Sequence, residues 1–115
     1  MSATVHYKGK LKLIEKVDNE TLEEQCKRLI ASHNFTKSNA SYYSWEEMLC
    51  DELYDKYVVC NNRVYEILEK QYINYYDDIS IAYENEDGTI SYEVKYYNGG
   101  CCFSEAIEYA LDELK

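Results

Sequence analysis

The sequence predicts an α+β protein in which a mostly antiparallel sheet of about four to five strands is packed by about two to three helices. Two observations predict this class: apolar and polar residues alternate in several short runs, and other runs have helical spacing after a capping signal. A hydrophobic content of 46% with 14 tyrosines excludes a disordered chain. At 115 residues, one domain spanning 1–115 is expected to bury a core without metal or disulfide staples.

The segment from Thr4 to Ile14 predicts a half-exposed strand. Its odd positions are mostly apolar and its even positions are polar, as in a strand with one buried face. Gly9 interrupts the apolar set, which predicts a β-bulge there. The outward side chains favour an edge position, because positive charge discourages pairing with another chain. A small basic patch is the alternative interpretation of this row, which contains His6, Lys8, Lys10 and Lys12.

A first helix is predicted to begin after Thr21. Thr21 and Glu24 have the spacing of a capping box, in which each side chain accepts a hydrogen bond from the other residue's backbone N–H. The apolar residues that follow have helical spacing, which places Cys26 in the core. They are Leu22, Cys26, Leu29 and Ile30.

The polar, aperiodic segment from Ser32 to Ser44 predicts the longest loop. It ends in Tyr42 and Tyr43. Two interpretations stay open for this pair: exposed tyrosines of an interface, or side chains that cover the edge of the core.

Ser44 and Glu47 repeat the capping-box spacing at the start of a second helix. Its inner face is predicted to contain Trp45, Met48, Leu49 and Leu53. Its outer face is predicted to be acidic, with Glu47, Asp51 and Asp55 four residues apart and Glu46 and Glu52 beside them. Like charges at this spacing repel by about a few tenths of a kcal/mol per pair, so helix stability does not explain them. The row is either a solubilising face or, at about 6 Å per four residues, an approximation to the charge of a nucleic-acid backbone.

Two hairpins and a closing helix are predicted for the second half. Asn61 and Asn62 tolerate positive φ, so they predict a primed turn between Tyr57–Cys60 and a following strand. A strand is preferred over a helix for residues 64–71. The second hairpin runs from Ile79 to Tyr96 around Glu86, Asp87 and Gly88. Ser104 is the expected N-cap of a helix whose first residue is Glu105 and whose apolar stripe is Phe103, Ile107, Ala110, Leu111 and Leu114.

The charge of the chain limits its partners. A net charge of −10, from 22 acidic and 12 basic residues, argues against direct binding of nucleic acid or an anionic membrane, so a charged partner should be basic. The sequence has no signal-peptide pattern and no apolar run that would span a bilayer, which predicts a cytoplasmic protein. The lack of proline and the abundance of Tyr, Asn, Ile, Lys and Glu are typical of AT-rich genomes, such as those of phages or bacterial mobile elements.

No metal site, cofactor or catalytic residue is predicted. The chain has no Cys-x-x-Cys or His-x-x-x-His pair. Cys101 and Cys102 follow a Gly-Gly turn before a helix, where the helix dipole lowers a thiol pKa. A thiol enzyme also needs a base, and nothing in the sequence brings His6 or His33 to that turn.

In size and composition the chain resembles the small acidic inhibitors carried by phages and mobile elements, which include DNA mimics and several anti-CRISPR proteins. The residues that carry this resemblance are acidic or tyrosine-rich: Glu46, Glu47, Asp51, Glu52, Asp55, Tyr75, Tyr76, Asp77, Asp78, Glu84, Glu86 and Asp87. The resemblance implies a non-catalytic protein that uses these residues to occupy the DNA- or RNA-binding surface of a basic partner, such as a CRISPR-Cas effector nuclease, in the bacterial host cell. Two alternatives remain: a small thiol-dependent enzyme built on Cys101, Cys102 and the Gly pair, and a homodimeric interaction protein.

Overall fold

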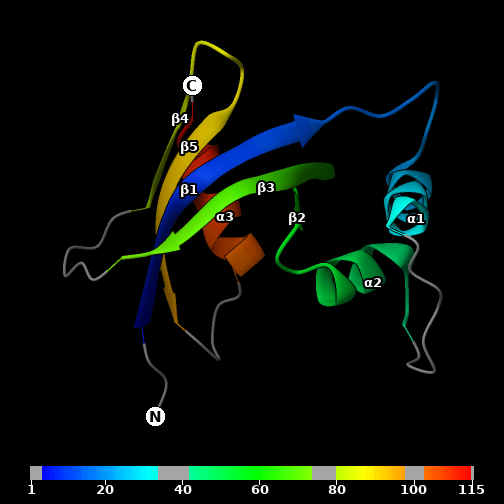
Figure 1. Ribbon diagram of the computed structural model, residues 1–115, viewed down its shortest axis with the longest axis horizontal. Helices are drawn as coiled ribbons and strands as arrows, with labels where there is room; N and C mark the ends of the chain where they lie inside the picture. The colour runs from blue at the N-terminus through cyan, green and yellow to red at the C-terminus, as the bar shows by residue number, and fades with distance from the viewer. Residues whose placement is uncertain (1–3, 34–41, 74–79, 98–102, 115) are drawn as a thin grey trace.

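The computed structural model describes residues 4–33, 42–73, 80–97 and 103–114. Its elements, drawn in Figure 1, follow the predicted order: β1 (Thr4–Ile14), α1 (Leu22–Ser32), α2 (Trp45–Glu52), β2 (Tyr57–Cys60), β3 (Arg63–Tyr72), β4 (Ile81–Glu84), β5 (Ile90–Tyr97) and α3 (Phe103–Asp112). The strands form a five-stranded sheet in the order β2-β3-β1-β5-β4, and each neighbouring pair is antiparallel. The α+β prediction is confirmed.

Strand β1 lies at the centre of the sheet, between β3 and β5, so the prediction of an edge strand is wrong. Its lysines are explained by their cross-strand neighbours instead. Lys8 pairs with Glu93 of β5, while Lys10 and Lys12 pair with Glu69 and Glu66 of β3. Opposite charges directly across an antiparallel pair stabilise the sheet. The lysine row is therefore a charge ladder across three strands.

The predicted bulge exists, but the extra residue is in β3. Lys10 pairs with Glu69 and Leu11 pairs with Ile67, so Leu68 has no partner in β1. Gly9 lies beside this irregularity for a steric reason. A Cβ atom on Gly9 would sit 1.8 Å from the carbonyl oxygen of Glu69, and only glycine allows so close an approach.

The bulge changes which β3 side chains face α3. Successive side chains of a strand point to opposite faces, so one extra residue reverses the alternation. Ile67, before the bulge, packs against the cluster under α3. After it, Lys70 lies over the ring of Phe103 of α3, and Tyr72 meets the ring of Tyr7 edge-on. Without the bulge, Lys70 would point to the opposite face.

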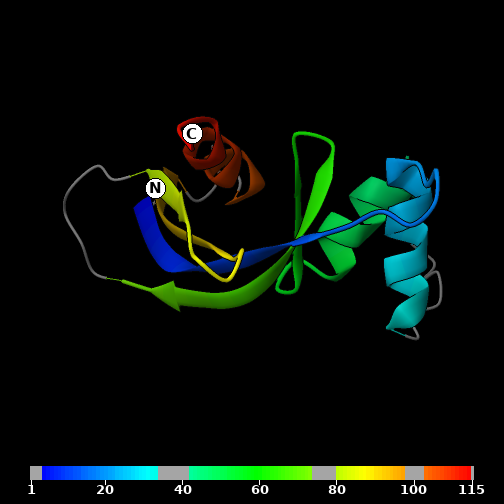
Figure 2. The same ribbon diagram turned by 90° about the horizontal axis from the view of Figure 1, so that it is seen from above.

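Two hydrophobic clusters make up the core. Figure 2 shows α3 against one face of the sheet and α1 and α2 beyond its β2–β3 end. The cluster under α3 contains Leu11, Val58, Cys60, Tyr65, Ile90, Tyr92, Val94, Ala106, Ile107, Ala110 and Leu111. The cluster under α1 and α2 contains Cys26, Leu29, Ile30, Met48, Leu49, Leu53, Tyr57, Val59 and Val64. Alternate residues of β2 enter different clusters, so all of β2 is buried.

The turns and helix ends agree with most of the predictions. Asn61 and Asn62 have φ values of 54° and 61°, as the β2–β3 turn requires, and β3 is a strand rather than a helix. Thr21 and Glu24 form the predicted capping box. Helix α3 begins at Phe103, so Ser104 lies in its first turn and is not the N-cap that the sequence predicted. Among the described residues, no helix has the length and apolar character needed to cross a membrane.

Candidate functional site

Helix α2 presents acidic residues on the side away from its core contacts. Met48 and Leu49 are buried against α1 and β2, which leaves Glu46, Glu47 and Asp51 exposed. The hydroxyl oxygen of Ser44 accepts a hydrogen bond from the backbone N–H of Glu47 at 3.1 Å and so fixes where the helix begins. Glu47 and Asp51 are one helical turn apart, as the sequence predicted.

Asp55 does not continue this row. Helix α2 ends at Glu52, and Leu53, with φ of −119°, is its C-cap. The backbone N–H of Tyr57 then donates to the carbonyl of Leu53 at 3.1 Å, which closes a turn that carries the chain into β2. Asp55 lies exposed in that turn. The predicted row of three carboxylates is therefore a pair on the helix, because the burial of Tyr57 in β2 requires the chain to leave the helix first.

Two of the predicted acids hold the preceding segment onto α2. The hydroxyl of Tyr42 donates a hydrogen bond to Glu52, and this bond raises the pKa of Tyr42 to about 12. The backbone N–H of Tyr43 donates to a carboxylate oxygen of Glu47 at 3.0 Å. Glu47 thus completes only half of the predicted capping box, because its side chain bonds to Tyr43 rather than to the backbone N–H of Ser44. Glu52 is half-buried and serves the fold.

The two tyrosines have different environments. Tyr42 packs against the α1–α2 cluster, whereas Tyr43 is 99% exposed. Tyr42 therefore covers the edge of the core, whereas Tyr43 is exposed and its role in an interface stays a prediction. Tyr54, at the other end of α2, is 66% exposed. Exposed aromatic side chains are typical of protein interfaces, where tyrosine and tryptophan contribute much of the binding energy.

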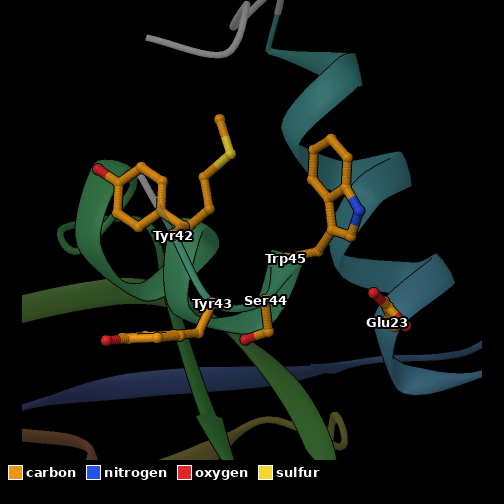
Figure 3. A pocket seen from close by; sticks show the side chains of 6 residues that line it. Glu23, Tyr42, Tyr43, Ser44 and Trp45 are labelled. Atoms are coloured by element: carbon orange, nitrogen blue, oxygen red, sulfur yellow. The ribbon is translucent and has the colours of Figure 1, made fainter. Parts of the chain in front are cut away.

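A small hollow lies between α1 and the start of α2. Its volume is about 130 Å³, and it is lined by Glu23, Tyr42, Tyr43, Ser44, Trp45 and Met48. Figure 3 shows the Trp45 ring beside α1 and the Tyr43 ring extended away from it. Lys27 Nζ lies 5.5 Å from the centre of the Trp45 ring, a cation–π contact of about 0.5–1 kcal/mol at an exposed site. We call the exposed set Tyr43, Glu46, Glu47, Asp51 and Tyr54 the α2 surface.

A second, larger hollow lies on the other side of α2. It has a volume of about 500 Å³ and is lined by Tyr7, Glu47, Cys50, Asp51, Tyr54, Tyr57, Val58, Lys70, Phe103 and Ser104. Lys70 Nζ lies 4.1 Å from the centre of the Phe103 ring and 4.7 Å from that of Tyr7. Sequence analysis did not identify this groove, because it depends on the bulge that turns Lys70 toward α3.

The other predicted partner-binding residues do not join the α2 surface. Figures 1 and 2 show the β4–β5 turn, which carries Glu84, Glu86 and Asp87, at a different corner of the molecule. Asp87 accepts hydrogen bonds from the backbone N–H and the hydroxyl of Thr89 at 3.0 and 2.6 Å, which lower its pKa. Asp87 therefore stabilises the turn. Tyr75, Tyr76, Asp77 and Asp78 lie outside the described residues.

The described residues contain no group of three His, Cys, Asp or Glu side chains that could hold a metal ion. Burial raises the pKa of Cys26 and of Cys60 to about 12, so both thiols stay protonated at neutral pH. His33 shares a hydrogen bond of 2.8 Å with the hydroxyl of Tyr57. The alternative thiol centre, Cys101 and Cys102 after Gly99 and Gly100, lies outside the described residues.

Comparison with known proteins identified no relative: no protein family, curated protein or solved structure matches this chain.

Proposed function

We propose that this protein is a non-catalytic inhibitor that binds a basic, nucleic-acid-handling protein through the α2 surface and occupies the site of its DNA or RNA. The observation that carries the proposal is the exposure of Tyr43 and Tyr54 at the two ends of a helix whose outer residues are Glu46, Glu47 and Asp51. Acidic groups would guide the encounter with a basic surface, and the tyrosines would anchor the complex.

The charge of the whole chain supports the same partner. At a net charge of −10 the protein repels nucleic acid and attracts cationic surfaces over about a Debye length. Glu47 and Asp51, about 6 Å apart along the helix axis, provide two neighbouring negative charges that a basic DNA-binding groove could accept. A CRISPR-Cas effector nuclease in the cytoplasm of a bacterial host is a partner of this type, and a phage or mobile element is the source that we propose.

The proposal predicts that two neutralised carboxylates on α2 weaken capture of the partner. We would compare the wild-type chain, the variant E46Q/D51N and the control E84Q/E86Q, in which the same number of charges is removed at the β4–β5 turn. Both variants have a net charge of −10 + 2 = −8. Both variants keep Glu52 and Glu47, which accept the hydrogen bonds of Tyr42 and Tyr43, so the fold should be kept. Each tagged protein would be incubated with lysates of bacteria that express CRISPR effectors, and bound proteins identified by mass spectrometry.

The expected result is capture of a basic nucleic-acid-binding protein that is released by salt, displaced by DNA and reduced at least about tenfold by E46Q/D51N. E84Q/E86Q should bind as the wild type does. If both variants lost the same fraction of captured partner, net charge alone would explain binding. That result would contradict specific binding through the α2 surface. Light scattering tests the homodimeric alternative, because a stable dimer that buries Tyr43 and Tyr54 is incompatible with the proposal.

A further inference from the structure

The groove between α2 and the first turn of α3 has properties that an acidic inhibitor does not need. Its volume of about 500 Å³ lies in the range of small-molecule sites, about 300–1,000 Å³. The groove is lined by Lys70 of β3, by Glu47 and Asp51 of α2, and by four aromatic rings, those of Tyr7, Tyr54, Tyr57 and Phe103.

Lys70 is turned into this groove by the bulge in β3. In the register Lys10–Glu69 and Leu11–Ile67, the extra residue Leu68 brings Lys70 onto the face that α3 covers. Bulges are frequent next to functional sites, where they redirect a side chain. A lysine that served only solubility would lie on the open face, where Lys8 and Lys10 already lie.

The ammonium group of Lys70 has no acceptor among the described residues. The ion pairs there are Lys10–Glu69 and Arg28–Glu20, and no hydrogen bond of Lys70 is present. Burial lowers the pKa of Lys70, and Asp55 partly offsets this effect. None of the carboxylates in the part of the chain that the structure describes lies within ion-pair distance of this half-buried cation. Its N–H groups are therefore available to an anion that enters the groove.

The rings beside Lys70 define the rest of the ligand. Tyr7 and Phe103 meet edge-on with ring centres 6.2 Å apart, and both lie under the ammonium group. Tyr54 and Tyr57 continue the aromatic lining toward α2. Such a wall favours a planar or apolar ligand body, because aromatic pairs gain stability in offset or edge-on contact.

We propose that this groove binds a small organic monocarboxylate with an aromatic body, and that its carboxylate pairs with Lys70. Glu47 and Asp51 repel a second negative charge, so a carboxylate should bind more tightly than a dianionic phosphate of similar size. The groove shares Glu47, Asp51 and Tyr54 with the α2 surface. The groups that we assign to the carboxylate and the aromatic body, Lys70, Tyr7 and Phe103, belong to β3, β1 and α3, outside that surface.

The test is a titration of the isotope-labelled full chain with 4-phenylbutyrate, followed by amide chemical shifts. We expect shifts around Tyr7, Lys70 and Phe103 that saturate at millimolar ligand. 4-Phenylbutanamide, which lacks the charge, and the variant Lys70→Met should each weaken binding at least about tenfold. The matched control is Lys8→Met, which removes an exposed lysine on the other face and should change the affinity by less than about twofold. Circular dichroism would verify that both variants are folded. If Lys70→Met does not fold, Lys70→Gln replaces it as the variant without the positive charge.

Phenyl phosphate identifies which anion the groove prefers. Phenyl phosphate should bind more weakly than 4-phenylbutyrate. The variant E47Q/D51N, which removes the two repelling carboxylates, should reduce this difference in affinity. Equal affinity for the carboxylate and its amide, unchanged binding by Lys70→Met, or no saturable shift at about 10 mM ligand would each overturn the proposal. None of these results depends on capture of a basic protein by the α2 surface, so the two proposals fail separately.

Discussion

Position 9 tolerates no side chain, because β3 passes too close to it. The Cβ of an alanine would lie 1.8 Å from the Glu69 carbonyl oxygen and 2.8 Å from the Tyr92 hydroxyl. That hydroxyl donates a hydrogen bond to the same carbonyl at 2.9 Å, so both neighbours are held in place. The contact involves backbone in a central strand pair, where relaxation would disturb the register.

We therefore expect Gly9→Ala to destabilise the protein by about 3 kcal/mol or more, at or above the upper end of typical overpacking costs. The control is Gly88→Ala in the β4–β5 turn. Gly88 has φ of +87° but open space around its Cα, so its substitution should cost only about 1 kcal/mol. Urea denaturation followed by circular dichroism measures both values. If the two variants unfolded at the same urea concentration, the close approach of β3 to Gly9 would be contradicted.

Single residues also mark the limit of what the sequence predicted about the site. Glu46, Glu47 and Asp51 were placed correctly on the outside of α2, because helical spacing is a local property. Lys70 was not identified, because its orientation depends on how β3 pairs with β1. Glu52 was predicted to bind a partner, and the structure shows that it accepts a hydrogen bond from Tyr42, which the sequence did not indicate. A sequence reports that an acid is present, but its hydrogen-bond partner is a tertiary property.

At the level of elements, the capping box of α1 is the feature most directly readable from the sequence. The backbone N–H of Glu24 donates to the Thr21 hydroxyl at 3.1 Å, and the backbone N–H of Thr21 donates to the Glu24 carboxylate at 3.0 Å. These bonds satisfy donors that the first turn of a helix leaves without partners. They also fix where the buried residues Cys26, Leu29 and Ile30 face.

Thr21→Ala should lower the free energy of unfolding by about 1 kcal/mol. Thr21→Ser keeps the hydroxyl, and it should recover most of this loss. Thermal and urea unfolding of the three proteins provide the comparison. If the alanine and serine variants were equally destabilised, lost side-chain packing rather than the cap would be responsible.

Elements whose signals are local were predicted well. The Asn61–Asn62 turn, the Gly88 turn and the order of the strands and helices all follow from residues close together in the chain. The position of β1 in the sheet was wrong because strand order depends on pairing between residues 50 or more apart, such as Leu13 with Tyr65. The lysines that suggested an edge strand lie opposite Glu66, Glu69 and Glu93 on the neighbouring strands, a pairing that the sequence does not show.

For the molecule as a whole, the important feature is that the β2–β3 hairpin belongs to both clusters. In β2, Val58 and Cys60 enter the cluster under α3, and Val59 enters the cluster under α1 and α2. In β3, Tyr65 belongs to the cluster under α3 and Val64 belongs to the cluster under α1 and α2. Neither cluster can lose its packing without exposing the hairpin, so we expect the described core to unfold as one cooperative unit.

Cysteine labelling tests this cooperativity, since Cys26 and Cys60 belong to different clusters. Because their pKa values are raised to about 12, only about one molecule in ten thousand has either thiol deprotonated at pH 8. Both side chains are also buried, so the alkylating reagent cannot reach them in the native protein. We expect both to be protected in the native protein and to become reactive at the same urea concentration. Alkylation followed by peptide mass spectrometry separates them from the other cysteines. Labelling of Cys26 at a clearly lower concentration would show that the α1–α2 half opens independently.

Strand β2, which is buried on both faces, also determines which positions are free to change over generations. Tyr57–Cys60 has no solvent side, so a polar replacement at any of its residues would damage one cluster or the other. Glu46 and Asp51 lie outside both clusters, on a helix held from beneath by Met48 and Leu49. Mutations at the outer positions of α2 can therefore accumulate without loss of the fold. A lineage whose partner keeps altering its own surface could follow those alterations through α2 while the hairpin stays constant.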